Sequence, residues 1–385
     1  MDYSYPPEVE SFRKALCEWL AANLTDEVIA AGRGRDRAGA GFDVLRAWDA
    51  KAADAGWAAV SWPREFGGRG ATVLEQLVYA EETTRARAPV PLNVIGMNNI
   101  APAIMHYGSE SQKRALLPRM MRADDIWCQG MSEPEAGSDL ASLRTRAVAD
   151  GDDFVVNGQK IWTSLGPRAD WCQLYVRTDP DAPKHKGISC LIVDMRLPGI
   201  EARPIRTLTG DSDFAEVFFT DVRVPATSLL GPLNGGWQVA TTTLSHERAG
   251  AARLYAEMEL RLQDLAADLV DATVGGRPAL EDTATLRRLG EVAVKIKYLE
   301  MLCLRSISAT LHGGDAFGSA SLAKTVWGEV GQELATLGFD MLGPQGADGR
   351  WARYRLSSRS LTIAGGTTQI NKNITATRVL GLPRK

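Results

Sequence analysis

The segment Met131–Asp139, which reads MSEPEAGSD, has the composition of a loop that binds a ligand. It contains serine hydroxyls, acidic residues, a proline and a glycine, and it shows no apolar periodicity that would place it in a core. Hydroxyls and successive backbone N–H groups can hold an anion or a polar ring, and Gly137 lets the backbone approach such a group closely. A segment of this composition is also typical of a surface turn, so the elements around it decide between the two interpretations.

The overall composition is that of a globular protein with roughly two or three domains. The chain has 385 residues, of which 45% are hydrophobic and 24% charged. Its net charge is −3 and it contains no basic block, which argues against nucleic acid as a partner. No apolar run is long enough to span a bilayer, and the polar N-terminus does not resemble a secretory signal. We therefore expect a cytoplasmic protein that does not bind membranes.

The thiol and imidazole side chains carry no signature of a disulfide framework or of a metal site. The five cysteines are scattered and show no CxxC spacing, so we expect buried free thiols. The four histidines show no HxxH or HExxH pattern. The sequence therefore predicts no metal ion.

Three regions with different periodicities position the loop. From about Val9 to Ala123 the apolar residues recur at helical spacing. From about Asp124 to Leu230 short runs rich in β-branched and aromatic residues predict strands, which we place at residues 155–162, 172–177, 187–195 and 215–224. From about Gly236 onward the pattern is helical again, with expected helices at residues 237–271, 281–311, 320–342 and 369–380.

This order of elements predicts an α+β chain. We expect an N-terminal helical domain (residues 1–123), a middle antiparallel β domain (residues 124–230) and a C-terminal four-helix bundle (residues 231–385). A helical domain, a β domain and a helix bundle in this order are an unusual combination.

Several further motifs occur in a fixed order around the loop. Trp62-Pro63 and Phe66-Gly67-Gly68 precede it, and the run GQKIWTS follows at residues 158–164. The run GTTQI occupies residues 366–370, and LGLPR occupies residues 380–384. Through these motifs the chain resembles the acyl-CoA dehydrogenase family over nearly its full length.

The resemblance implies an enzyme that binds FAD between the β domain and the helical domains. Such an enzyme removes two hydrogens from an acyl thioester: a base takes the α proton and the flavin N5 takes the β hydride. Ser132 would then lie near the flavin ring and Ser138 near the pyrophosphate, while Trp162 would stack near the ring. The complete set of cofactor-binding residues that the resemblance implies is Gln129, Met131, Ser132, Ser138, Trp162, Thr163, Ser164, Thr367 and Gln369.

Strand residues of these types also have simpler explanations. An aromatic residue such as Trp162 is often half-buried on a strand, and Thr163 with Ser164 is compatible with a turn at a strand end.

The catalytic base is absent from the position where many family members carry it. Those members have a glutamate directly before the Gly-Thr of the C-terminal motif, and here Gly365 occupies the corresponding position. A branch of the family instead carries a Glu-Arg pair on the first long helix of the C-terminal domain, which Glu247 and Arg248 match. The resemblance implies that Glu247 is the base, that Arg248 organises the substrate pocket, and that the Gly365 N–H holds the thioester carbonyl. The alternative is that Glu247 and Arg248 are solvated helix residues.

An expected cofactor contact is also missing. Many family members carry Arg-x-x-Phe-Gly at the start of the second bundle helix, where it holds the adenine half of the neighbouring subunit's FAD. Residues 272–280 contain no such motif, although Arg277 lies among them. Either the chain is a homo-oligomer that holds FAD differently, or it forms a heterotetramer with a related subunit that supplies the motif. The second arrangement resembles actinobacterial dehydrogenases that act on steroid side-chain CoA esters.

The resemblance leaves several functions open. Besides an acyl-CoA dehydrogenase that passes electrons to an electron-transfer flavoprotein or a similar acceptor, the same fold supports flavin-dependent oxidases and monooxygenases. The chain is also compatible with a non-catalytic subunit of a heteromeric dehydrogenase, although Glu247 argues against that interpretation. The acyl group is not specified by any motif.

Overall fold

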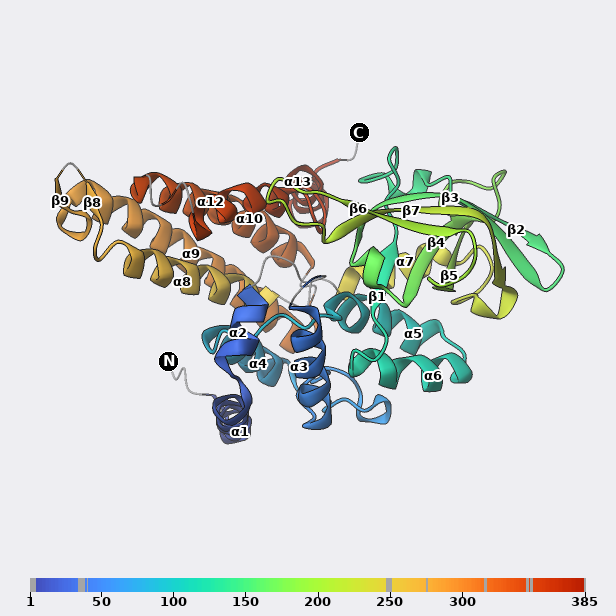
Figure 1. Cartoon of the computed structure of the whole chain (residues 1–385), viewed down its shortest axis with the longest axis horizontal. Coiled ribbons are helices and arrows are strands. Elements are labelled where there is room, and N and C mark those ends of the chain that lie inside the picture. The colour runs from blue at the N-terminus through green and yellow to red at the C-terminus, as the bar shows by residue number, and fades with distance from the viewer. Residues whose placement is uncertain are drawn as a thin grey trace. The chain divides into compact units, whose positions relative to one another are not determined.

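The computed structural model divides the chain into two compact units (Figure 1). It describes residues 5–383 except 34–38, 40, 247–250, 275, 315–316, 344–345 and 347–348. Unit 1 comprises Met1–Ala22, Thr72–Arg87 and Arg248–Lys385, and unit 2 comprises Asn23–Ala71 and Ala88–Glu247. The domain boundaries expected at residues 123 and 230 remain a prediction.

Unit 2 is built on a seven-stranded sheet with the order β1-β4-β2-β3-β7-β6 and with β5 paired to β4. Its pairs are antiparallel, except that β1 pairs with β4 in parallel and that β2 meets β4 at one parallel position. The strands are β1 (Trp127–Gly130), β2 (Arg146–Asp150), β3 (Asp153–Ser164), β4 (Trp171–Arg177), β5 (Ile188–Asp194), β6 (Ile200–Ile205) and β7 (Phe214–Pro225).

The strands expected at residues 155–162, 172–177, 187–195 and 215–224 are confirmed as β3, β4, β5 and β7. The sequence did not reveal β1, β2 and β6. β1 is only four residues long, and β2 and β6 are largely exposed, so neither an apolar run nor a clean alternation marks them.

Helices accompany the sheet in unit 2, and local signals in the sequence explain their ends. Ser109 and Gln112 form a capping box at the start of α6, in which each side chain bonds the other residue's backbone N–H at 3.2 and 2.9 Å. The helices are α2 (Asp26–Arg33), α3 (Phe42–Asp54), α5 (Ala101–Tyr107), α6 (Glu110–Met121) and α7 (Gly236–His246).

The Trp62 motif has a structural role. Trp62 is buried and its indole N–H donates to the carbonyl of Met97 at 3.1 Å. Gly68 folds back so closely that a Cβ at this position would lie 2.1 Å from the Trp62 carbonyl oxygen. Only glycine therefore allows this return of the chain.

Unit 1 is a helical bundle around one apolar core, to which Leu265, Leu299, Val330 and Leu334 contribute fully or almost fully buried side chains. The N-terminal segment joins this core, because α4 packs on α8 and the buried Tyr255 hydroxyl donates to Glu81. The helices of the unit are α1 (Pro7–Asn23), α4 (Val73–Arg85), α8 (Ala251–Asp268), α9 (Thr283–Leu311), α10 (Phe317–Met341), α12 (Arg350–Ser357) and α13 (Thr368–Ile374).

The helices expected at residues 281–311 and 320–342 are confirmed as α9 and α10. The helix expected at 369–380 is confirmed as α13, which continues into a π-helical turn at Thr375–Val379. Helix α12 was not predicted: its buried side chains Trp351 and Tyr354 make a single short stripe among arginines. In the described part of the chain, none of the helices has the length and apolarity needed to cross a membrane.

Candidate functional site

The fold places the loop Met131–Asp139 beside the middle of β3. The Ile161 N–H donates to the Ser132 carbonyl at 2.9 Å, and the Lys160 ammonium donates to the Met131 carbonyl at 3.1 Å. The two segments that the sequence assigned to the flavin ring are therefore adjacent, although they are separated along the chain.

A buried ion pair stabilises the contact between the loop Met131–Asp139 and β3. Lys160 is completely buried, and its ammonium lies 2.9 Å from a carboxylate oxygen of Glu133. Glu133 also accepts the backbone N–H groups of Arg144 at 2.6 Å and Thr145 at 2.8 Å. Burial acts to raise the pKa of Glu133, but the Lys160 charge and these hydrogen bonds outweigh burial and hold that pKa below its ordinary value. Burial lowers the pKa of Lys160, and the Glu133 charge opposes that shift.

A β-bulge at the end of β3 changes the direction of the Trp162 side chain. The pairing of β3 with β7 shifts register between Lys160 and Thr163, and Trp162 adopts a positive φ of 60°. Trp162 is 57% exposed, while Lys160, two residues before it, and Thr163, directly after it, are buried. A bulky residue with positive φ is strained, and such strain is typical of functional sites.

Thr163 carries a buried hydroxyl that has no hydrogen-bond partner among the described residues. Its side chain is 1% exposed, and leaving a buried hydroxyl unpaired costs on the order of 1–3 kcal/mol. No described residue of this chain supplies that partner, so the hydroxyl is available to an ordered water or a ligand atom. A polar ring edge would satisfy the hydroxyl and the exposed indole of Trp162 would stack on the ring face, so these residues fit a flavin.

We expect Thr163→Val to weaken FAD binding about tenfold, because it removes one hydrogen bond to the ring while keeping the shape of the side chain. Thermal stability should stay unchanged or rise, since an unpaired buried hydroxyl is lost. Quenching of flavin fluorescence on binding measures the dissociation constant. Thr325→Val is the matched control, because Thr325 is a buried threonine whose hydroxyl bonds Ser321 within α10 at 3.0 Å. Equal affinities for both variants would contradict the assignment.

Gln129 belongs to a hydrogen-bonded chain that joins β1 to α7. Its side chain accepts from Asn99 at 3.5 Å and donates to Gln173 at 3.2 Å. Gln173 in turn donates to the Thr243 hydroxyl at 3.3 Å, and the Tyr175 hydroxyl lies 3.2 Å from the same atom. Because Thr243 lies on α7, four residues before Glu247 in the sequence, this network anchors the helix that precedes the expected base.

The cofactor contact expected of Gln129 stays a prediction, and sequence reasoning did not connect Gln173, Thr243 and Tyr175 with it. A signal was present: Gln173 is a fully buried amide within the apolar strand WCQLYVR, and buried amides are normally paired.

The far end of the loop is open to solvent. Gly137 and Ser138 are exposed, and a Cβ on Gly137 would meet nothing within 4 Å. Asp139, the next residue, is held by Lys184, whose ammonium lies 2.8 Å from the carboxylate. Exposed backbone at this end is compatible with the phosphate contact expected of Ser138, which stays a prediction.

The C-terminal motif forms a tight turn in unit 1. Gly365 and Gly366 have φ values of 67° and 88°, which favour glycine at both positions. Thr367 caps α13 by accepting the Ile370 N–H at 3.2 Å, and its hydroxyl hydrogen is not used by this cap. Gln369 and Gly365 are exposed.

Glu247 and Arg248 lie outside the described residues, so their roles remain predictions. Helix α7 ends at His246 and α8 begins at Ala251, on either side of them.

A short hairpin occupies the place of the missing Arg-x-x-Phe-Gly motif. Strand β8 (Thr273–Val274) pairs with β9 (Arg277–Pro278) between α8 and α9. Arg277 is exposed at its tip.

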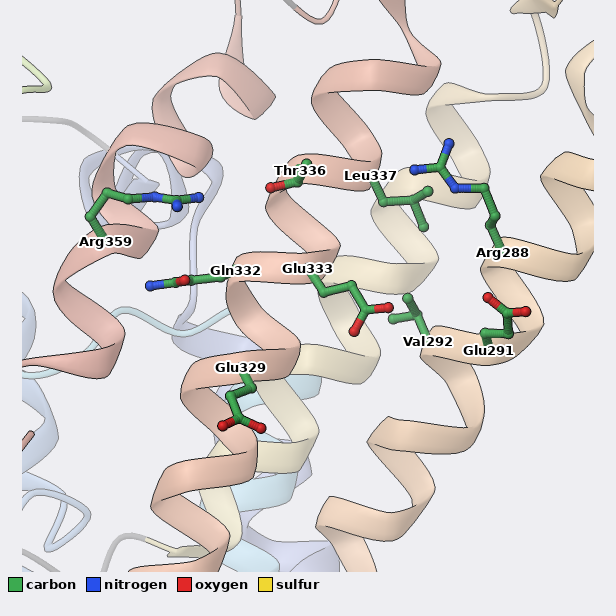
Figure 2. A pocket seen from close by; sticks show the side chains of 9 residues that line it. All are labelled: Arg288, Glu291, Val292, Glu329, Gln332, Glu333, Thr336, Leu337 and Arg359. Atoms are coloured by element: carbon green, nitrogen blue, oxygen red, sulfur yellow. The ribbon is translucent and has the colours of Figure 1, made fainter. Parts of the chain in front are cut away.

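A pocket of about 390 Å³ lies between α9 and α10 in unit 1 and contains none of the expected site residues (Figure 2). Two of its three acidic residues have basic partners, since Glu333 pairs with Lys295 at 2.6 Å and Glu329 with Lys372 at 3.2 Å. Surface ion pairs of this kind are common and contribute little. Within the described part of the chain no cluster of His, Cys, Asp or Glu could hold a metal ion.

Comparisons with known proteins match the chain to one family. Family models match along most of the chain: the acyl-CoA dehydrogenase N-terminal domain at residues 6–124, the middle domain at 128–222 and the C-terminal domain at 234–380.

Individual relatives match over nearly the full length. The chain is 38% identical to the acyl-CoA dehydrogenase IpdE1 of Mycobacterium tuberculosis, over 98% of this chain and 99% of that one. Among solved structures, the Tcur3481-Tcur3483 steroid ACAD superposes with a TM-score of 0.88 at 32% identity, with complete coverage of both chains. The ChsE4-ChsE5 complex of M. tuberculosis gives 0.87 at 36% identity, also with complete coverage of both.

Proposed function

Because the chain belongs to the acyl-CoA dehydrogenase family, we propose that it is the FAD-binding, catalytic subunit of a dehydrogenase that acts on steroid side-chain CoA thioesters. The observation that carries the proposal is the junction of the loop with β3. There Lys160 and Ile161 bond the Met131 and Ser132 carbonyls, and the exposed Trp162 and the unpaired hydroxyl of Thr163 follow directly along β3.

The flavin, when bound, supplies the acceptor for the β hydride. Glu247 removes the α proton, and the pocket must desolvate this carboxylate so that it becomes basic enough to form the enolate. The Gly365 N–H donates to the thioester carbonyl and stabilises the charge that develops on the oxygen. Arg248, next to the base, organises the pocket. Thr163 and Ser164 would hold the polar edge of the ring.

The substrate class is inferred from relatives. The Tcur3481-Tcur3483 protein is a steroid ACAD, and this chain aligns with it completely. We therefore favour a CoA ester whose acyl chain is attached to a bulky polycyclic group over a simple linear fatty acyl-CoA.

The partner we propose is a related subunit that supplies the Arg-x-x-Phe-Gly contact, in a heterotetramer. One of the matching structures is a complex of two proteins, ChsE4 and ChsE5. On this chain, α9 exposes Val294, Tyr298 and Met301, with exposed fractions of 70%, 52% and 54%. Their spacing places them on one face of the helix, and such an apolar stripe marks a protein interface. An electron-transfer flavoprotein or a similar acceptor would reoxidise the flavin.

Anaerobic mixing with a panel of acyl-CoA esters tests the proposed activity. Linear, branched and steroid side-chain esters are added to the flavin-loaded assembly, and loss of the oxidised flavin absorbance is followed. We expect rapid bleaching by the steroid esters and formation of the enoyl-CoA product. No bleaching by any ester would contradict dehydrogenation, and rapid reoxidation by air would indicate an oxidase or monooxygenase instead.

A further inference from the structure

We propose that Lys160 and Glu133 are positioning residues that hold the Met131–Ser132 backbone in the conformation that receives the flavin. This inference rests on the proposed function, because it concerns the same cofactor. Both residues lie within the flavin motifs, but the resemblance assigned neither of them a role in the site.

The pair connects three segments that are separate along the chain. Lys160 belongs to β3 and bonds both the Met131 carbonyl and the Glu133 carboxylate. The same carboxylate accepts the N–H groups of Arg144 and Thr145, which lead into β2. Glu133 also exchanges two backbone hydrogen bonds with Ala136, both of 3.1 Å, so its own loop turn is closed at the same point.

The bond to Met131 sets the direction of the next N–H. In a trans peptide the carbonyl and the following N–H point to opposite sides, so the Ser132 N–H points away from Lys160. The Ser132 carbonyl is separately held by the Ile161 N–H at 2.9 Å. Both peptide planes are thereby fixed, and the Ser132 N–H is directed to the side opposite the ion pair, where a ligand can accept it.

Stability alone does not account for a pair of this kind. Bringing two charges out of water is expensive, and a well-packed apolar pair of similar volume is often equally stable or more so. An apolar side chain in place of Lys160 could not donate to the Met131 carbonyl, however, and the orientation of that peptide would be lost. The Lys160 ammonium thus orients the Met131 peptide through a hydrogen bond that an apolar side chain cannot make.

The test compares Lys160→Met, Glu133→Gln and the double variant in the full chain, in the assembly in which the wild type binds FAD stoichiometrically. The readouts are the FAD dissociation constant, the absorption spectrum and midpoint potential of the bound flavin, and amide hydrogen exchange of residues 131–136 without FAD. Arg119→Met is the control, because it breaks an ion pair with Asp125 at 2.7 Å in the same unit, on a more exposed side chain and without touching the loop.

We expect Lys160→Met to weaken FAD binding about 30-fold, to shift the flavin spectrum and potential, and to speed exchange of the loop amides. The double variant should unfold near the wild-type temperature, since no charge is left unpaired, yet keep the weak binding and the shifted spectrum. The control should lose stability without either change.

Several outcomes overturn the inference. If the double variant keeps the wild-type FAD affinity, flavin spectrum and amide exchange, the pair has only a structural role. The same conclusion follows if Arg119→Met shifts the flavin spectrum as far as Lys160→Met does. If Lys160→Met alone does not fold, the double variant is compared with the wild type instead. Failure of the wild-type assembly to bind FAD would instead contradict the proposed function, so the two failures are distinguishable.

Discussion

Glu247→Gln will retain FAD but oxidise acyl-CoA about a thousand-fold or more slowly than the wild type. Glutamine keeps the size and polarity of the side chain but cannot accept the α proton at neutral pH. Since no glutamate stands at Gly365, no second carboxylate at that position can replace the base. Stopped-flow measurement of flavin bleaching gives the rate of this step directly.

A second readout separates a base from a structural residue. The wild type should exchange the substrate α proton with deuterium from solvent when hydride transfer is slow or blocked, and Glu247→Gln should abolish that exchange. Glu259→Gln is a suitable control, because Glu259 lies on α8 and pairs with Lys297 at 2.7 Å on the surface of the bundle. Turnover of Glu247→Gln near the wild-type rate would remove Glu247 from the mechanism.

The chain purified alone will bind FAD about 100-fold more weakly than the chain purified with a related subunit that carries Arg-x-x-Phe-Gly. A bidentate arginine–phosphate contact is among the stronger hydrogen-bonded pairs, and its loss together with an aromatic contact accounts for an effect of this size. The hairpin at Thr273–Pro278 offers no phenyl ring at this position. Equilibrium dialysis with FAD measures both affinities.

Arg277→Gln distinguishes the two ways of completing the site. In the heteromer the partner holds the adenine half, so this substitution should change FAD affinity less than about threefold, as expected for an exposed surface arginine. In a homo-oligomer that uses Arg277 as a substitute, the affinity should fall about as far as it does when the partner is absent. Stoichiometric FAD and full activity in the isolated chain would exclude a required partner.

Much of the fold could be predicted because its signals are local. Apolar residues at strand and helix spacing located β3, β4, β5, β7, α9 and α10, where each segment alone buries enough apolar surface to show its period. Helix α12 and strands β1, β2 and β6 lacked such a period. The contribution of α4 to the bundle core was also invisible, because the buried contact between Glu81 and Tyr255 joins residues 174 positions apart.

The candidate site, like the fold, could be predicted only in part. The loop and the end of β3 were identified from residue types and motif order, yet nothing in the sequence indicated that Trp162 would have positive φ or that the Thr163 hydroxyl would lack a partner among the described residues. Both follow from the bulge against β7, which depends on how two distant strands pair.

The sequence by itself determined the family, the polar character of Met131–Asp139 and the presence of a glycine at position 365 and a glutamate at position 247, because residue identity and order are all that these require. Only the tertiary structure decided what Glu133 and Lys160 do. Acidic and basic residues are usually solvated, and their sequence positions give no reason to pair them. Folding of β3 against the loop buries both charges together, and burial makes their hydrogen bonds strong enough to orient the backbone beside the flavin motifs.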